Sequence, residues 1–268
     1  MLVIPQQEPE AHDDRREIHI VEYTGKPVSR TIFAIRETSL HIFINDLPFV
    51  RLACTGKYPA YLAVGFLFSC GVIESAADID GLDIVNNGEE GLEARLRLNR
   101  SLTLPTRTVT SGLGSTFQMP KATMAPLPPA PKDYFEAETI MRLSGELEER
   151  ANLYHITRGC HNSSLCSNDT MLLYREDIGR HNAIDTLVGQ CLLEERDTSA
   201  VMILSTGRIA SEIVQKVVRA RIPVLASTAA ATSIAVENAR AFGLTLMGKT
   251  SPKGMWIYNN TGCLRVSS

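Results

Sequence analysis

The 268-residue sequence lacks several features that mark broad classes of protein. No apolar run approaches the roughly 18 residues of a membrane span, so we expect no membrane partner. The amino-terminal stretch 1–17 has no long apolar core, which argues against a signal peptide. A net charge of only −3 provides no general attraction to nucleic acid. We therefore expect a cytoplasmic protein that binds neither nucleic acid nor membranes.

Paired cysteine motifs are also absent. The six cysteines are scattered, and no two of them form C-x-x-C. This spacing argues against a disulfide framework and a structural zinc site. The H-x-E and P-C-x-x-C motifs of zinc deaminases are missing as well, so we expect no protein-bound metal.

What is present is the composition of an ordinary globular protein, with 44% hydrophobic and 21% charged residues. We divide it into a loose amino terminus (1–16), an α+β domain (17–119), a proline-rich linker (120–132) and an α/β domain (133–268). In the first domain, alternation predicts strands at 17–21, 39–44, 47–53, 78–85 and 92–98, and a buried helix at 58–70 that ends before Gly71. The small, hydroxyl-rich stretch 107–116 predicts a mobile loop rather than a regular element.

The second domain alternates strands with helices. A capping box formed by Asp133 and Glu136 predicts a helix that runs to about Ala151. Strands are expected at 153–157, 170–174, 201–204, 224–226 and 244–247. Helices are expected at 183–192, 211–221 and 232–242, the last closed by Gly243. This alternation predicts a mostly parallel or mixed sheet covered by helices on both faces.

Three strand-to-helix turns carry polar side chains. Backbone N–H groups at such turns suit a phosphate. Because open α/β sheets bind ligands at these strand ends, we expect the turns to share one site, although the same side chains could simply cap helices. The stretch 248–254 could clamp a diphosphate, or could be an exposed β-turn with solvated lysines. The candidate binding residues are Arg180, His181, Asn182, Thr206, Gly207, Arg208, Ser227, Lys249, Thr250, Ser251, Pro252, Lys253 and Gly254.

Cys160 is the candidate catalytic residue. It lies between Arg158 and His161, and such neighbours lower the pKa of a thiol and favour the reactive thiolate. The alternative is that Cys160 is a small buried core residue.

The segment 175–185, REDIGRHNAID, resembles the signature REDVGRHNAVDK of the FdhD family of formate dehydrogenase accessory proteins. Three other segments are also similar to family motifs: 62–68, 206–216 and 222–236. The resemblance extends over about residues 39–258.

The resemblance implies a three-layer, cytidine-deaminase-like α/β/α domain without zinc, a smaller α+β domain before it, and a homodimer. It implies a sulfur carrier that takes sulfur from a cysteine desulfurase as a persulfide. The sulfur would pass to the molybdenum or tungsten bis-molybdopterin guanine dinucleotide cofactor before its insertion into the catalytic subunit of formate dehydrogenase. By this resemblance, 249–254 matches the family's cofactor-binding segment, with two lysines in place of an arginine-rich run.

The sequence departs from the family at its sulfur loop. Family members have a cysteine in a CGxCG or SGCG loop, and the best register places Leu113 at that position, which cannot hold a persulfide. Three functions stay open. The chain is a sulfur carrier that uses Cys160 or Cys166, a non-catalytic escort that binds the cofactor, or a nucleotide-binding module with no molybdenum role.

Overall fold

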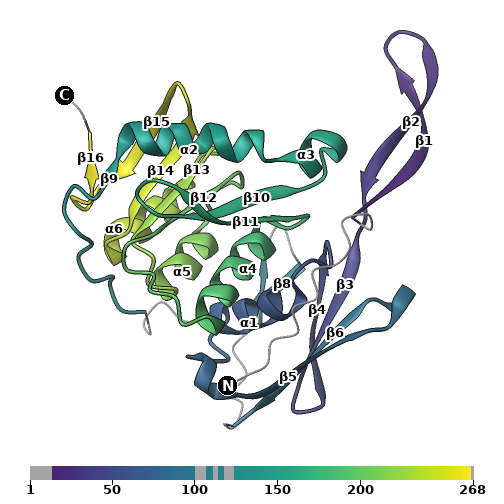
Figure 1. Cartoon of the computed structure of the whole chain (residues 1–268), viewed down its shortest axis with the longest axis horizontal. Helices are drawn as coiled ribbons and strands as arrows, with labels where there is room; N and C mark the ends of the chain where they lie inside the picture. The colour runs from purple at the N-terminus through teal and green to yellow at the C-terminus, as the bar shows by residue number, and fades with distance from the viewer. Residues whose placement is uncertain (1–13, 100–106, 111–113, 118–123, 267–268) are drawn as a thin grey trace.

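The computed structural model describes residues 14–99, 107–110, 114–117 and 124–266 (Figure 1). These residues form a mixed α/β protein with several sheets and six α-helices in the described ranges. No helix among them is long and apolar enough to cross a membrane.

A six-stranded sheet forms the centre of the carboxyl-terminal half. Its order is β11 (Met171–Asp177), β10 (His161–Cys166), β12 (Met202–Ser205), β13 (Val224–Ser227), β14 (Thr245–Ser251) and β15 (Gly254–Asn259). The strands β12, β13 and β14 are parallel, whereas β10 runs antiparallel to both β11 and β12. The carboxyl ends of β11 to β14 therefore meet the amino end of β10 along one border, which we call the carboxyl edge.

Helices cover both faces of this sheet (Figure 1). On one face, α2 (Ala137–Glu149) packs against Met202 and Leu204. On the other, α4 (Arg180–Leu193), α5 (Ser211–Arg219) and α6 (Ser233–Phe242) share a core with Ile203. Successive residues of β12 thus point to opposite faces, as strand geometry requires. The predicted sheet between two helical layers is confirmed, and the relation to cytidine deaminases stays a prediction.

The amino-terminal half contains a four-stranded sheet of order β4 (Leu47–Cys54), β3 (Thr38–Ile44), β6 (Leu92–Leu98) and β5 (Ile79–Asn86). Two short 3-10 turns, η1 (Ala76–Asp78) and η2 (Gly88–Glu90), flank β5. Its helix α1 (Pro59–Ser69) crosses α4 at two glycines. A Cβ atom on Gly65 would lie 1.8 Å from the Asp185 carbonyl oxygen, and one on Gly189 would lie 1.9 Å from that of Tyr61. The two halves therefore touch backbone to backbone.

Two antiparallel strands, β1 (Arg15–Tyr23) and β2 (Pro27–Ile35), form a ribbon that projects from the rest of the molecule (Figure 1). We call residues 15–35 the arm. A second ribbon pairs β7 (Arg107–Thr110) with β8 (Gly114–Phe117), so the expectation that 107–116 contains no regular element is wrong. Leu113, in the predicted sulfur loop, lies outside the described residues.

Glycines close two helices as expected, since Gly71 and Gly243 follow α1 and α6 with φ of 77° and 70°. The linker is only partly described. There Leu127 is buried, and its N–H donates to the Phe242 carbonyl at 2.8 Å. This part of the linker therefore packs against the α/β domain. The proposed domain boundaries stay predictions.

Two predictions for the second half are wrong, and some of its strands were missed. Residues 153–157 belong to the helix α3 (Asn152–Thr157), in which only Leu153 is buried, so there is no apolar face for a sheet. Asp133 does not cap a helix, because β9 (Phe135–Glu136) pairs with β16 (Leu264–Arg265) and delays the start of α2 to Ala137. The strand β10 was not expected.

Candidate functional site

The turn from β11 into α4 is fixed by the buried carboxylate of Asp177. Its Oδ2 accepts hydrogen bonds from Thr55, one from the backbone N–H at 3.0 Å and one from the hydroxyl at 3.1 Å. Its Oδ1 accepts from the Gly179 N–H at 2.9 Å and from Nδ2 of Asn182 at 2.8 Å. The same Asn182 amide donates to the Ala53 carbonyl at 2.8 Å. Asn182, a predicted ligand residue, therefore uses its amide group to connect the two halves of the chain.

The turn after β12 lies directly against the start of α4. A Cβ atom on Gly207 would come within 2.7 Å of Cβ of Arg180, so only glycine allows this approach. The Ser227 hydroxyl, at the end of β13, donates to the Gly207 carbonyl at 2.7 Å. Thr206 accepts at 3.0 Å from the N–H of Asn162, at the start of β10. The predicted turns are thus neighbours along the carboxyl edge.

A cavity of about 680 Å³ opens at this edge. Its walls come from α2, α3 and the segment that leads into β10, from the ends of β12 and β13, and from β14 and the turn that follows it. The lining residues are Ser144, Glu148, Ala151, Tyr154, Arg158, Gly159, Cys160, His161, Asn162, Ile178, Thr206, Thr228, Lys249, Thr250, Ser251 and Pro252. This volume lies within the roughly 300–1,000 Å³ of small-molecule sites.

The structure divides the predicted residues into three groups. Cys160, Thr206 and 249–252 line the cavity. The predicted residues that do not line it are Arg180, His181, Asn182, Gly207, Arg208 and Ser227. Lys253 and Gly254 lie at the tip of the β14–β15 hairpin, where Lys253 is exposed, as in the exposed-turn alternative.

Sequence reasoning missed several wall residues, including Tyr154, His161 and Thr228. His161 and Thr228 directly follow Cys160 and Ser227 in the chain, so adjacency could have suggested them. Tyr154 carried no such signal, because its helix was interpreted as a strand.

Positive charge gathers on the α4 and α5 side of the edge. Burial first, and then the guanidinium of Arg208, lowers the pKa of Arg180. Burial and the charge of Arg180 lower the pKa of His161, which places Arg180 near this wall residue. Glu212 supplies a nearby opposing charge. Two neighbouring guanidinium groups, one of them near the cavity wall, suit an anion with several oxygens.

His181 is buried beside this pair. Burial, followed by the charges of Lys216 and Arg180, lowers the pKa of His181 to about 2. The imidazole is therefore neutral at physiological pH. Lys216 itself is held by the buried carboxylate of Asp185, which also accepts from the Ser69 hydroxyl at 2.6 Å.

Three polar atoms near the cavity have no hydrogen-bond partner within the described ranges. They are Oγ1 of Thr250, Nε of Arg180 and Nδ1 of His181. Thr250 is only 2% exposed and lines the cavity. Because a buried polar atom without a partner costs about 1–3 kcal/mol, these three atoms are candidates to pair with a bound water or ligand.

Cys160 does not have the environment of a reactive thiolate. Burial, and next the carboxylate of Glu176, raises the pKa of its thiol to about 12. The expected effect of Arg158 is lost, because that guanidinium packs over the Tyr154 ring at 5.1 Å. All six cysteines of the chain are buried. In the part of the chain that the structure describes, no three His, Cys, Asp or Glu side chains are grouped to hold a metal ion.

Comparison with known proteins decides the family. The model of the FdhD/NarQ family matches residues 35–265, which include the whole carboxyl edge. The chain belongs to this family. Its arm lies almost entirely before the matched region.

Curated relatives carry the family name. The sulfur carrier protein FdhD of Listeria monocytogenes serotype 4b is 31% identical over 219 residues, covering 79% of this chain and 84% of the relative. That of Wolinella succinogenes is also 31% identical and covers 85% of this chain and 81% of its own length. A crystal structure described as a formate dehydrogenase accessory protein from Desulfotalea psychrophila superposes with a TM-score of 0.78 at 23% identity. It covers 94% of this chain and 99% of its own, and supports the fold.

Proposed function

We propose that this FdhD/NarQ protein is a formate dehydrogenase accessory protein that binds the molybdenum or tungsten bis-molybdopterin guanine dinucleotide cofactor at the carboxyl edge. The observation that carries the proposal is the buried hydroxyl of Thr250, which has no partner among the described residues and belongs to a residue of the cavity wall. Relatives named as sulfur carriers, and a similar fold described as a formate dehydrogenase accessory protein, support the choice of ligand and of client enzyme.

The chemistry of the edge fits a ligand rich in phosphate oxygens. Three threonines, Thr206, Thr228 and Thr250, line the cavity together with Lys249, which adds a positive charge. The guanidinium of Arg180 lies near the wall residue His161, and that of Arg208 lies near Arg180, so the pair would stabilise a diphosphate that extends out of the cavity toward them. Bound there, the cofactor supplies the redox-active metal that the client needs. The residues of this chain bind, orient and shield it.

The chain fits an escort better than a persulfide carrier. Its predicted sulfur loop contains Leu113 in place of a thiol, and burial raises the pKa of Cys160 to about 12. We therefore propose that it holds the cofactor in the cytoplasm, while sulfur from a cysteine desulfurase reaches the cofactor through another thiol protein.

A second candidate, sulfur carriage by Cys160, is favoured by one observation. The thiol lies in the cavity wall beside His161, where a persulfide would face the ligand. The two candidates differ in a measurable way. Incubation with a cysteine desulfurase and cysteine should leave the mass of an escort unchanged, whereas a carrier should gain one sulfur atom at Cys160. A labile adduct that disappears in Cys160→Ala would establish the carrier.

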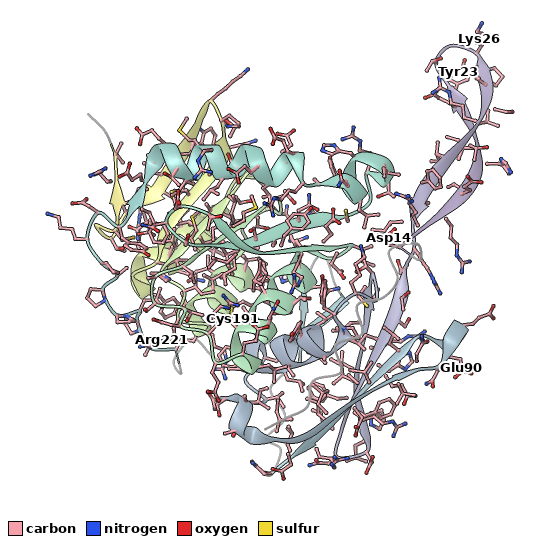
Figure 2. The ribbon with its side chains drawn as sticks, viewed as in Figure 1. Asp14, Tyr23, Lys26, Glu90, Cys191 and Arg221 are labelled. Atoms are coloured by element: carbon pink, nitrogen blue, oxygen red, sulfur yellow. The ribbon has the colours of Figure 1, made fainter. Side chains whose placement is uncertain are left out.

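Calorimetric titration with GDP, a probe for the guanine dinucleotide end, tests the binding site. Losing one charge-assisted hydrogen bond costs about 1.5–3 kcal/mol, so Arg180→Gln and Arg208→Gln should each weaken binding by roughly tenfold or more. Arg221→Gln is the matched control, because Arg221 is exposed near the opposite edge of the sheet (Figure 2). Equal affinity in all three variants would remove the carboxyl edge as the site. Binding of GDP but not of the pterin cofactor would instead favour a plain nucleotide-binding module.

A further inference from the structure

The helices that line the cavity contribute a carboxylate to a wall that is otherwise neutral or positive. The helices α2 and α3 follow one another on one side of the six-stranded sheet (Figure 1). Among the described residues that line the cavity, Glu148 alone is acidic. It is exposed, and its carboxylate forms no ion pair or hydrogen bond within the described ranges. This carboxylate is therefore available to a ligand.

A carboxylate constrains how a phosphate-bearing ligand can lie in the cavity. Glu148 would repel phosphate oxygens, so the ligand must turn another part of itself toward α2. That part has to offer N–H donors, because an ionised carboxylate only accepts hydrogen bonds. Lys249 and the threonines of the wall belong to the strand ends rather than to the helices. The phosphates are therefore expected at the strand ends and an uncharged donor group at the helices.

Further along the same wall, Tyr154 and Arg158 form a flat surface. Both line the cavity, and Tyr154 is 37% exposed. Cζ of Arg158 lies 5.1 Å from the centroid of the Tyr154 ring. Arg158 has a left-handed backbone conformation, with φ of 56°, which glycine adopts at lower cost. Strain that is kept at a cavity wall points to a role in binding, and planar side chains of this kind stack on nucleobases.

We propose that this helical wall recognises a 2-amino-4-oxopyrimidine ring, which stacks on Tyr154 and Arg158 and donates two hydrogen bonds to the carboxylate of Glu148. Guanine and pterin both contain this ring. In both, a ring N–H and an amino group lie side by side, as a carboxylate that accepts two parallel hydrogen bonds requires. The inference rests on the proposed function, because both rings belong to the cofactor named there.

The same hydrogen bonds discriminate against other purines. Adenine pairs its amino donor with an unprotonated ring nitrogen, whose lone pair would face a carboxylate oxygen of Glu148. Hypoxanthine keeps the ring N–H but lacks the amino group, so it forms one of the two hydrogen bonds. Glu148 is therefore the residue that determines specificity, whereas stacking on Tyr154 and Arg158 stabilises any planar base.

Calorimetric titration of the full chain with GDP, IDP and inorganic pyrophosphate tests the role of Glu148. IDP differs from GDP only by the missing amino group. Losing one charge-assisted hydrogen bond weakens binding about tenfold or more, so the unmodified chain should prefer GDP to IDP by this factor. In Glu148→Gln this preference should largely disappear, while pyrophosphate should bind at least as tightly as before. The control Glu149→Gln, at an exposed residue that does not line the cavity, should keep the preference.

Two further variants test the stacking surface. Tyr154→Leu should weaken GDP and IDP equally, by about five- to a hundredfold, and should leave the affinity for pyrophosphate unchanged. Arg158→Gly should also weaken both nucleotides. Its midpoint of urea unfolding should stay nearly the same, because glycine tolerates the backbone conformation at this position. A loss of affinity in Arg158→Gly would then not be due to misfolding.

Neopterin, a soluble pterin without phosphate, distinguishes the two sources of the ring. Weaker binding of GDP to Glu148→Gln would place guanine at the helical wall, and weaker binding of neopterin would place the pterin there. If the unmodified chain binds GDP and IDP equally, and Glu148→Gln changes neither GDP nor neopterin binding, the inference is overturned while the proposed function stands. An unmodified chain that binds neither GDP nor a pterin would overturn both.

Discussion

Two sets of polar groups at the carboxyl edge differ in how fully their hydrogen bonds are made. In the first, Thr55, Gly179 and Asn182 donate four hydrogen bonds to the carboxylate of Asp177. We call it the closed cluster. In the second, Arg180, His181 and Thr250 each have a buried polar atom without a partner in the described residues. We call it the open cluster.

The comparison shows that one sequence signature serves two purposes. Within residues 177–182, Asp177 and Asn182 hold the two halves of the chain together, while Arg180 and His181 keep polar atoms available. A group whose hydrogen bonds are complete contributes to stability, whereas a buried group without a partner is a candidate to pair with a ligand. Variants in the closed cluster should therefore change the free energy of unfolding, and variants in the open cluster should change affinity.

The largest effect on stability is expected at the contact between α1 and α4, which, like the closed cluster, joins the two halves of the chain. Gly189→Ala would push a methyl group against the Tyr61 carbonyl, and backbone cannot move aside as a flexible side chain can. We expect a loss of more than about 3 kcal/mol in the free energy of unfolding, measured by urea denaturation. The matched control is Gly145→Ala in α2, whose new Cβ would meet only a Pro252 side-chain carbon at 3.0 Å. A loss of comparable size in the control would show that the helix crossing is not the cause.

Removing the acceptor of the closed cluster should have the next largest effect. Asp177→Ala leaves the N–H groups of Thr55 and Gly179 and the Asn182 amide without their partner. Each buried unpaired group costs about 1–3 kcal/mol, and partial relaxation of the structure reduces the sum. The free energy of unfolding should therefore fall by about 2–3 kcal/mol. Asp169→Ala, which removes an exposed carboxylate, should cost less than about 0.5 kcal/mol. If both variants unfold at the same urea concentration, Asp177 does not hold the two halves together.

The open cluster should respond to pH through His181. Its pKa is lowered to about 2 in the folded protein, against about 6.5 when unfolded. Below pH 6.5 the unfolded chain binds a proton that the folded chain excludes, so stability is retained above this pH and lost as the pH falls. As the pH is lowered from 6.5 to 5, the free energy of unfolding of the unmodified chain should fall, and that of His181→Gln should fall by about 1–2 kcal/mol less. Urea titrations at each pH measure the difference.

His155→Gln provides the control for this pH dependence, because His155 is exposed. The free energy of unfolding of His155→Gln should change with pH in the same way as that of the unmodified chain. A parallel decline in stability for His181→Gln and the unmodified chain would mean that His181 is protonated in the fold.

The smallest effect on stability is expected at Thr250. Thr250→Val replaces a hydroxyl that makes no hydrogen bond within the described residues by a methyl group of similar shape, so the free energy of unfolding should change by less than about 0.5 kcal/mol. The affinity for GDP, measured by calorimetry, should fall roughly two- to tenfold. Thr198→Val, far from the cavity, should leave the affinity unchanged. A destabilised Thr250→Val with full affinity would reverse the assignment of Thr250 to the open cluster.

Local signals in the sequence predicted most elements of the central sheet. The apolar runs of β12, β13 and β14, and the amphipathic pattern of α5, follow from short-range periodicity. The strand β10 could not be found in this way, because its residues Asn162, Ser163 and Ser164 are polar. They are buried only because distant groups satisfy them, such as the Ser205 hydroxyl for Ser163 and the Leu173 carbonyl for Ser164.

The candidate site was predictable as a set of turns but not as a cavity. Strands that are joined by helices run parallel, so the carboxyl ends of β12, β13 and β14 meet at one edge of the sheet. The other wall depends on β10, since its antiparallel insertion brings Cys160 and His161 to that edge. It also depends on α3, whose single buried residue gives no periodic signal.

The amino-acid sequence alone determined the repeated strand-turn-helix units, the glycines that end α1 and α6, and the absence of a thiol at Leu113, because each depends on neighbours a few residues away. Only the tertiary structure decided which residues of the signature turn are engaged and which are available. That distinction depends on hydrogen bonds between residues more than a hundred positions apart, such as those from Thr55 to Asp177, and no local pattern encodes them.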